Sequence, residues 1–232
     1  MGLSGRLITS AHNAKLRLVR KLLSARKHRD ETGLFAVEGE DLVEAASGAG
    51  IDPVELLVAG ENVESALLGA LSTLGHAPRV VGVYRRSDLP TGRREVTLAL
   101  WRVGDPGNVG TLLRTADAFG AAVSLSEGCA DPLGPRALRA SAGAVFRVPH
   151  VAWREPGARH IALVAHGGAS LADVDLTPPL TLLLGGEREG LPDGLVTPSH
   201  DVATIPLPGA AESLNVAAAG AIALYELSRR GS

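Results

Sequence analysis

Residues 96–120 read VTLALWRVGDPGNVGTLLRTADAFG, and this stretch sets the expected fold. The apolar run Val96–Trp101 predicts a buried strand, and the turn-forming residues 105–107 follow it. Apolar residues then recur at helical spacing over Val109–Phe119, and Asn108 is suited to cap the start of that helix. A strand, a tight turn and an amphipathic helix in this order predict an α/β domain.

The alternation of strands and helices continues toward the C-terminus. We expect strands at Ala122–Leu125, Ile161–Ala165, Leu180–Leu184 and Val202–Ile205, and a final helix at Leu214–Leu227. Because several of these strands are unbroken apolar runs, the pattern predicts a parallel sheet covered on both faces. The final helix is apolar almost all round and is therefore expected to be buried.

A smaller α/β unit precedes this series. The pattern predicts helices at His12–Arg29, from Glu40 and at Val63–Leu74, and strands at Phe35–Val37, Val54–Val58 and Arg79–Val83. The polar stretch 85–94 is the best candidate for a linker. We therefore expect one domain over 1–84 and a second over 95–232.

Charge is distributed unevenly along the chain. The net charge is −2, yet the first 29 residues hold eight Lys or Arg and no acid, so the remainder is acidic. A basic arm on an acidic body suits polyanion binding, and a solvated basic helix is the alternative. Aromatic residues make up only 3%, which argues against a base-stacking platform. The candidate RNA-binding residues are Lys15, Arg17, Arg20, Lys21, Arg26 and Lys27.

Composition also excludes several classes of protein. The single cysteine, Cys129, excludes an internal disulfide framework and is expected to be a small, partly buried side chain. The seven histidines are scattered without metal-ligand spacing, so no metal is expected. No stretch approaches the roughly 20 apolar residues of a membrane span, and we expect a cytoplasmic protein with no membrane partner.

Two further segments combine a strand end with polar residues. Gly185, Gly186 and Glu187 directly follow an apolar strand, at the edge where open α/β sheets bind ligands. The alternative is a tight turn with exposed charges. Near the last helix, Ser213 is a candidate cap, while Asn215 enters an Ala-rich helix and must find polar partners there.

Together these segments resemble the signature motifs of the SpoU/TrmH family of SPOUT-superfamily RNA methyltransferases. The block Asn108-Val109-Gly110 with Arg114, the Gly185–Gly190 turn and Ser213–Ala217 occur in the family's order, and residues 139–146 are also similar. The resemblance covers about residues 96–227. Residues 33–39 are similar to a substrate-binding domain that is often joined to these enzymes and resembles RNA-binding ribosomal proteins.

The resemblance implies a parallel α/β fold with a deep trefoil knot, a homodimer formed through the C-terminal domain, and S-adenosyl-L-methionine as methyl donor. It also implies methylation of a ribose 2′-hydroxyl of structured RNA, with rRNA favoured over tRNA. The implied cofactor-binding residues are Leu184, Gly185, Gly186, Ile205, Leu207, Ser213 and Leu214. The implied catalytic residues are Arg114, Asn108, Glu187, Ser213 and Asn215.

The role of Arg114 needs a physical qualification. An arginine stays protonated in proteins and is therefore a poor general base. We favour a role in which Arg114 stabilises developing alkoxide charge or binds the adjacent phosphate.

Other functions remain open from the sequence. A tRNA 2′-O-methyltransferase and a non-catalytic RNA-binding protein that retains the fold are the main alternatives. A nucleotide-dependent Rossmann enzyme is disfavoured, because the chain has neither a Gly-x-Gly-x-x-Gly turn nor a P-loop motif.

Overall fold

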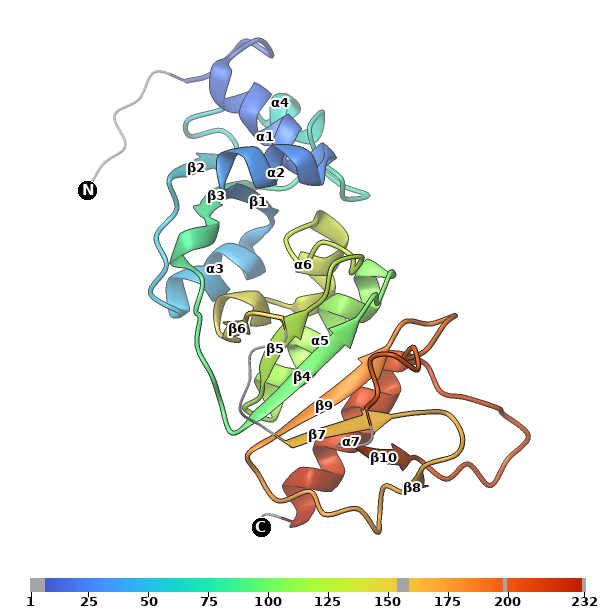
Figure 1. The fold of residues 1–232 in the computed structure, drawn as a ribbon. Helices are drawn as coiled ribbons and strands as arrows, with labels where there is room; N and C mark the ends of the chain where they lie inside the picture. Colours follow the sequence, from blue (N-terminus) through green and yellow to red (C-terminus); the bar gives the residue numbers. More distant parts are fainter. Residues whose placement is uncertain (1–6, 154–158, 198–199, 231–232) are drawn as a thin grey trace.

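The computed structural model describes residues 7–153, 159–197 and 200–230, and it contains two β-sheets. The smaller sheet lies in the N-terminal part (residues 7–89) and the larger in the C-terminal part (residues 90–230), as Figure 1 shows. All neighbouring strands of the seven-stranded sheet are parallel, in the order β6-β5-β4-β9-β7-β10-β8. The predicted parallel α/β fold with a smaller N-terminal unit is confirmed.

The N-terminal part is an antiparallel sheet of order β1-β3-β2 with four helices. Its elements are α1 (Ala14–Ser24), α2 (Arg26–Thr32), β1 (Leu34–Glu38), α3 (Glu40–Gly48), β2 (Glu55–Val58), α4 (Ser65–Gly69) and β3 (Val80–Arg85). A 3-10 turn, η1 (Arg86–Asp88), follows.

The single helix expected over residues 12–29 is two helices. Ala25 adopts an extended conformation between α1 and α2. Leu16, Val19, Leu22 and Leu23 are the buried side of α1, and this apolar stripe stops at Leu23. The first helix ends at Ser24, and the buried side chain of α2 is Arg29. The helix expected over 63–74 is likewise confined to α4.

The C-terminal part alternates strands and helices as predicted. Its elements are β4 (Val96–Trp101), α5 (Pro106–Ala118), β5 (Ala122–Leu125), α6 (Pro135–Ser141), η2 (Ala144–Phe146), β6 (His150–Val151), β7 (Arg159–Leu163), β8 (Ala169–Ser170), β9 (Leu180–Gly185), β10 (Asp201–Thr204) and α7 (Val216–Arg230). Within the described ranges, no helix is long and apolar enough to cross a membrane. The trefoil knot implied by the resemblance stays a prediction.

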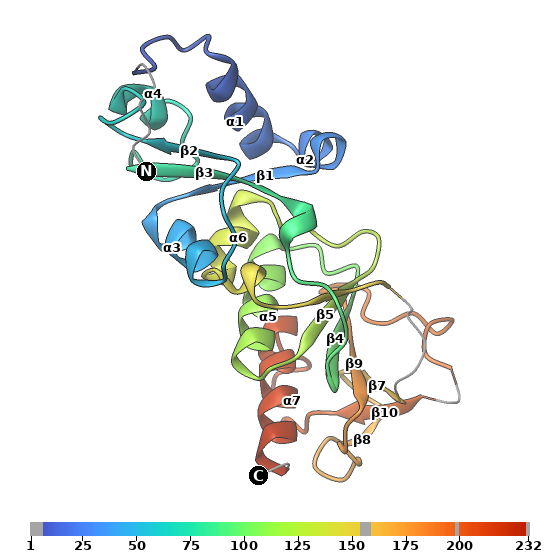
Figure 2. The same ribbon diagram turned by 90° about the vertical axis from the view of Figure 1, so that its left-hand side faces the viewer.

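The main core lies between one face of the large sheet and the helices α5 and α7. Leu98, Leu100, Leu182 and Leu184 point toward these helices from adjacent strands. Figure 2 shows α5 and α7 on the same side of β4 and β9. This packing fixes the start of each helix at the edge where the strands end.

The opposite sheet face differs from the expectation of cover on both sides. Thr97, Thr181 and His160 lie in register on three adjacent strands of that face. In the described part of the chain, loops rather than helices lie over it (Figure 2). The next positions on this face are Ala99, Leu183 and Ala162, which are buried, so the loops cover an apolar part of the face as well as the polar one.

The final helix is only partly buried. Val216, Gly220, Ala223 and Leu224 face the core, but Ile222 and Tyr225 keep 40% and 59% of their surface exposed. The expectation of a wholly buried helix is therefore wrong for the single chain.

A second apolar cluster joins the two parts of the molecule. The rings of Phe35 and Tyr84 in the small sheet pack against Phe146 in η2, with centroid separations of 6.0 and 5.4 Å. All three rings are fully or almost fully buried. The two parts therefore share a core instead of meeting only at a polar surface.

We predict that Phe146→Ala lowers the free energy of unfolding by about 3–5 kcal/mol, because it leaves a cavity in this shared cluster. Val54→Ala is the control, since Val54 is 42% exposed and its truncation should cost much less. Urea denaturation measures both variants. Equal losses would contradict the role assigned to the cluster.

Candidate active site

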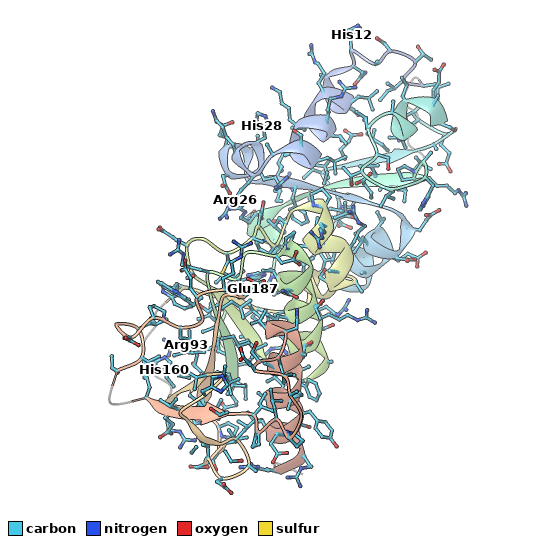
Figure 3. All side chains as sticks on the ribbon, turned by 90° about the vertical axis from the view of Figure 1, so that its right-hand side faces the viewer. His12, Arg26, His28, Arg93, His160 and Glu187 are labelled. Atoms are coloured by element: carbon cyan, nitrogen blue, oxygen red, sulfur yellow. The ribbon has the colours of Figure 1, made fainter. Side chains whose placement is uncertain are left out.

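The three motif segments of the C-terminal part meet at one edge of the large sheet. Trp101 and Gly185 are register partners at the ends of β4 and β9, so the loops that follow them start side by side. The start of α7 lies against the same loops through Asn215. Figure 3 shows Glu187 at this edge, in the middle of the molecule.

Glu187 is the acceptor that joins the first two loops. Its carboxylate accepts hydrogen bonds from the backbone N–H groups of Gly104 and Asp105, at 3.1 and 3.2 Å. The side-chain amide of Asn108 donates a third bond to Oε1, at 2.8 Å. A carboxylate is the right group here, because it accepts several hydrogen bonds and donates none.

Asn108 also bonds to the third motif segment, at the start of α7. Its Oδ1 accepts a hydrogen bond from Nδ2 of Asn215 at 3.0 Å. The side chains of Glu187, Asn108 and Asn215 thus form one hydrogen-bonded chain across three loops, which we call the polar triad. The sequence predicted all three as site residues, and the structure brings them together.

The helix caps differ from those expected. Asp105, not Asn108, caps α5, because its Oδ1 accepts the N–H of Asn108 at 3.0 Å. Asn215, not Ser213, serves α7, since its Oδ1 accepts from the N–H of Ala217 at 2.9 Å and of Ala218 at 3.3 Å. Pro106 occupies the first position of α5, and the cap lies three residues upstream of the expected position.

The hydrogen bonds hold Glu187 in its charged form. Partial burial acts to raise the pKa of this carboxyl, but the bond from Asn108 and the backbone N–H bonds outweigh it. The pKa therefore lies below its ordinary value of 4.5, and Glu187 is ionised at neutral pH.

Beside the polar triad lies a cleft of about 620 Å³, a size in the usual range for a small-molecule site. Its walls come from the ends of β7 and β9 and from the segments before α7. Every residue expected to bind a cofactor lines it: Leu184, Gly185, Gly186, Ile205, Leu207, Ser213 and Leu214. Leu163, Val164 and Ala165 also line it and were not predicted, although they too lie at a strand end.

The glycines of the second motif serve the protein's own packing. A Cβ at Gly185 would lie 2.1 Å from the backbone carbon of Gly190, and one at Gly186 would lie 2.6 Å from the carbonyl oxygen of Arg102. Both glycines also line the cleft, so the expectation that they bind the cofactor stays a prediction beside this packing constraint. They allow the loop after β9 to fold back on itself and against the loop after β4.

Arg114 is not brought into the cleft. It stands exposed on α5 and does not line the cleft of its own chain. Among the described residues it has no hydrogen-bond or ion-pair partner. Its guanidinium is thus available to another molecule.

The predicted RNA-binding cations fall into two groups. Arg17, Arg20 and Lys21 are exposed on α1 without an ion-pair partner among the described residues. Lys15, Arg26 and Lys27 are each within 4 Å of a carboxylate, those of Glu55, Asp30 and Glu31 respectively.

A second cleft, of about 630 Å³, lies on the other face of the sheet. Thr97, Thr181 and His160 line it, and the His160 ring meets that of His200 at 5.0 Å. It holds none of the predicted site residues.

We predict a pH dependence for the contribution of Glu187. Because its pKa is lower in the folded protein, the ionised group stabilises the fold fully above about pH 4.5, and this contribution is lost as pH falls through the lowered pKa. The unfolding free energies of the wild type and Glu187→Gln should therefore differ most at neutral pH and converge in acid. A difference that grows on acidification would contradict the assignment.

Two family models match the chain. The SpoU rRNA methylase family model matches residues 95–225. The model of the MRM3-like substrate binding domain matches residues 13–84.

Relatives of known name match over different lengths. The 23S rRNA (guanosine(2553)-2′-O)-methyltransferase RlmP of Bacillus subtilis is 31% identical, over 95% of this chain and 98% of its own. The 23S rRNA (uridine(2479)-2′-O)-methyltransferase of Streptomyces viridochromogenes is 37% identical, over 56% of this chain and 50% of its own.

Solved structures share the whole architecture. The rRNA methyltransferase of Sinorhizobium meliloti with bound AdoMet superposes with a TM-score of 0.85 at 31% identity, covering 97% of this chain and 98% of that one. The SpoU methyltransferase AviRb of Streptomyces viridochromogenes, in complex with AdoMet, gives 0.83 at 28% identity, covering 94% and 98%. The chain belongs to the SpoU rRNA methylase family.

Proposed function

We propose that this protein methylates a ribose 2′-hydroxyl of ribosomal RNA, with S-adenosyl-L-methionine as the methyl donor. The observation that carries the proposal is the polar triad, of which Glu187 and Asn215 line a cleft of about 620 Å³. The relatives named for 2′-O-methylation of 23S rRNA favour rRNA over tRNA as the substrate. A substrate of this kind is in keeping with a cytoplasmic protein.

The residues of the cleft fit the donor. Leu184, Ile205 and Leu214 give an apolar lining, and the loop backbone around them offers hydrogen-bonding groups, a combination that suits an adenosine. The ionised carboxylate of Glu187 adds negative charge to the wall, which suits a cationic sulfonium. When bound, S-adenosyl-L-methionine supplies a methyl group activated by that sulfonium.

The chain itself must position the hydroxyl and compensate for the loss of its proton. Transfer would form a bond between the ribose oxygen and the methyl carbon and break the carbon–sulfur bond. The electron pair of that bond would stay on sulfur, giving a neutral thioether, and the hydroxyl proton would pass to solvent water. Positioning accounts for much of the rate in such a transfer. Arg114 stabilises the developing alkoxide or holds the neighbouring phosphate, while Asn108, Glu187, Ser213 and Asn215 order the loops around them.

The direct test is transfer of labelled methyl groups to total RNA from cells that lack the gene, followed by nucleoside analysis. We expect label in a 2′-O-methylated nucleoside of rRNA. Label in tRNA would support the alternative substrate. Wild-type protein that binds the donor and RNA but transfers no methyl group, either to naked rRNA or to ribosomal particles, would support a binding protein.

In the same assay, Arg114→Ala should lower kcat by about 100- to 1,000-fold, as expected when one electrostatic stabiliser of a transition state is removed. Donor affinity should stay within about twofold, because the proposed partners of Arg114 are the ribose oxygen or the phosphate of the RNA and not the donor. Near-normal transfer by the folded variant would refute the role of Arg114.

We further propose that the protein is a homodimer formed through the C-terminal part. Phe119, Ile222 and Tyr225 are large apolar side chains that stand exposed at the end of α5 and on α7, two helices that pack together. Exposed apolar groups of this kind are typical of an interface. A second copy bound at these helices would also bring the Arg114 of one chain toward the cleft of the other, which the Arg114 of its own chain does not line.

Tyr225→Asp should raise the dimer dissociation constant by roughly 30-fold or more, because it places a charge in the apolar interface. Val54→Asp is the matched control, since Val54 is an apolar residue of the N-terminal part with 42% exposure. Sedimentation velocity measures both. A monomeric wild type would overturn the proposal.

The division of the chain follows the two family models. We propose a substrate-binding domain over 1–84, a linker over 85–94 and the methyltransferase domain over 95–232, supported by matches at 13–84 and 95–225. In this division, the affinity for RNA comes mainly from contacts between its phosphates and the N-terminal cations.

Neutralising Arg17, Arg20 and Lys21 together should weaken RNA binding and flatten the plot of log affinity against log salt by roughly 2 to 3, given about 0.7–0.9 per phosphate contact. Arg147→Gln is the control, because Asp117 already pairs that exposed cation at 2.7 Å. An unchanged salt slope in the triple variant would exclude these residues from the RNA interface.

A further inference from the structure

Arg29 belongs to the basic N-terminal run but is not available to RNA. Only 4% of its surface is exposed. Its Nε lies 2.7 Å from Oδ2 of Asp131 in the C-terminal part, and its guanidinium also donates to the carbonyl of Leu22 in α1. One side chain therefore ties both α1 and α2 to a loop of the C-terminal part.

That loop runs from the end of β5 to the start of α6 and is bonded to the end of β4. The N–H of Ala130 donates to the carbonyl of Val103 at 2.9 Å, and the N–H of Arg102 donates to Oγ of Ser126 at 2.9 Å. The next residues along the chain, Gly104 and Asp105, are those whose N–H groups hold Glu187. The loop that holds Asp131 is therefore hydrogen-bonded to the loop after β4, and the loop after β4 is hydrogen-bonded to Glu187 of the polar triad.

A second contact joins α2 to the same loop of the C-terminal part. The guanidinium of Arg26 in α2 donates to the carbonyl of Cys129 at 3.2 Å. Figure 3 shows Arg26 between His28 on the N-terminal helices and Glu187 at the cleft. Both contacts therefore lie on the side of the N-terminal part that faces the cleft.

A buried ion pair adds little net stability compared with an apolar pair of similar size, because both charges lose their hydration. The pair does fix the position of α1 and α2 relative to the loop that holds Asp131. We propose that Arg29 and Asp131 are positioning residues, which hold the RNA-binding helices at a set place relative to the methyl-donor cleft so that bound RNA presents its ribose there. This inference rests on the proposed function.

The pair is tested with the double variant Arg29→Met/Asp131→Leu, which removes both charges and leaves neither one buried alone. Either single substitution leaves one buried charge unpaired and is expected to destabilise the protein. The control is Arg79→Met, which breaks an exposed ion pair with Glu40, 3.6 Å long, that lies wholly within the N-terminal part.

For the double variant we expect a melting temperature close to that of the wild type, rRNA affinity within about threefold, and kcat for methyl transfer lowered at least about tenfold. Hydrogen exchange of the amides at Arg102, Gly104 and Asp105 should become faster. The control should change none of these quantities.

A double variant with wild-type kcat and wild-type amide exchange would overturn the inference. So would a loss of rRNA affinity that matches the loss of kcat, because that outcome makes the pair part of the RNA-binding surface. If the wild type transfers no methyl group to any rRNA, the proposed function fails, while the exchange rates still decide whether the pair controls the loops beside Glu187.

Discussion

The carboxylate of Glu187 accepts hydrogen bonds from two backbone N–H groups and from Asn108, and the site depends on this one acceptor. Parallel strands bring their following loops to one edge of a sheet, but they do not fix the conformations of those loops. The polar triad does so, because Glu187 comes from the loop after β9, Asn108 from the first turn of α5 and Asn215 from the start of α7. The cleft lies directly against this triad.

The basic residues of the N-terminal part differ in exposure and in pairing. Arg17, Arg20 and Lys21 carry charge at the surface of α1, where a phosphate backbone can reach it. Arg29, eight residues beyond Lys21, is buried and joined to Asp131. In the two proposals made above, the exposed cations of this stretch bind RNA and its buried arginine orients the helices that carry them.

Much of this structure can be predicted from the sequence. The strand β4 and the helix α5 follow from an apolar run and a helical period, and the site loops follow from glycines and polar residues at strand ends. Tertiary contacts decide the rest. Whether Asn108 caps a helix or bonds Glu187 depends on a residue 79 positions away, and the burial of Arg29 depends on one 102 positions away. The exposure of Tyr225 on an apolar helix likewise depends on what else packs there.

The affinity for the methyl donor tests the central claim most directly. Isothermal titration calorimetry with S-adenosyl-L-methionine would compare the wild type with Asn108→Asp, which replaces the amide that bonds Glu187 with a second carboxylate. Asn62→Asp is the matched control, because the Asn62 amide donates to the backbone of Leu56 in the N-terminal part. The account predicts that only Asn108→Asp loses affinity, by at least about tenfold, as expected when close like charges disturb a binding loop. Equal donor affinity in all three proteins would contradict it.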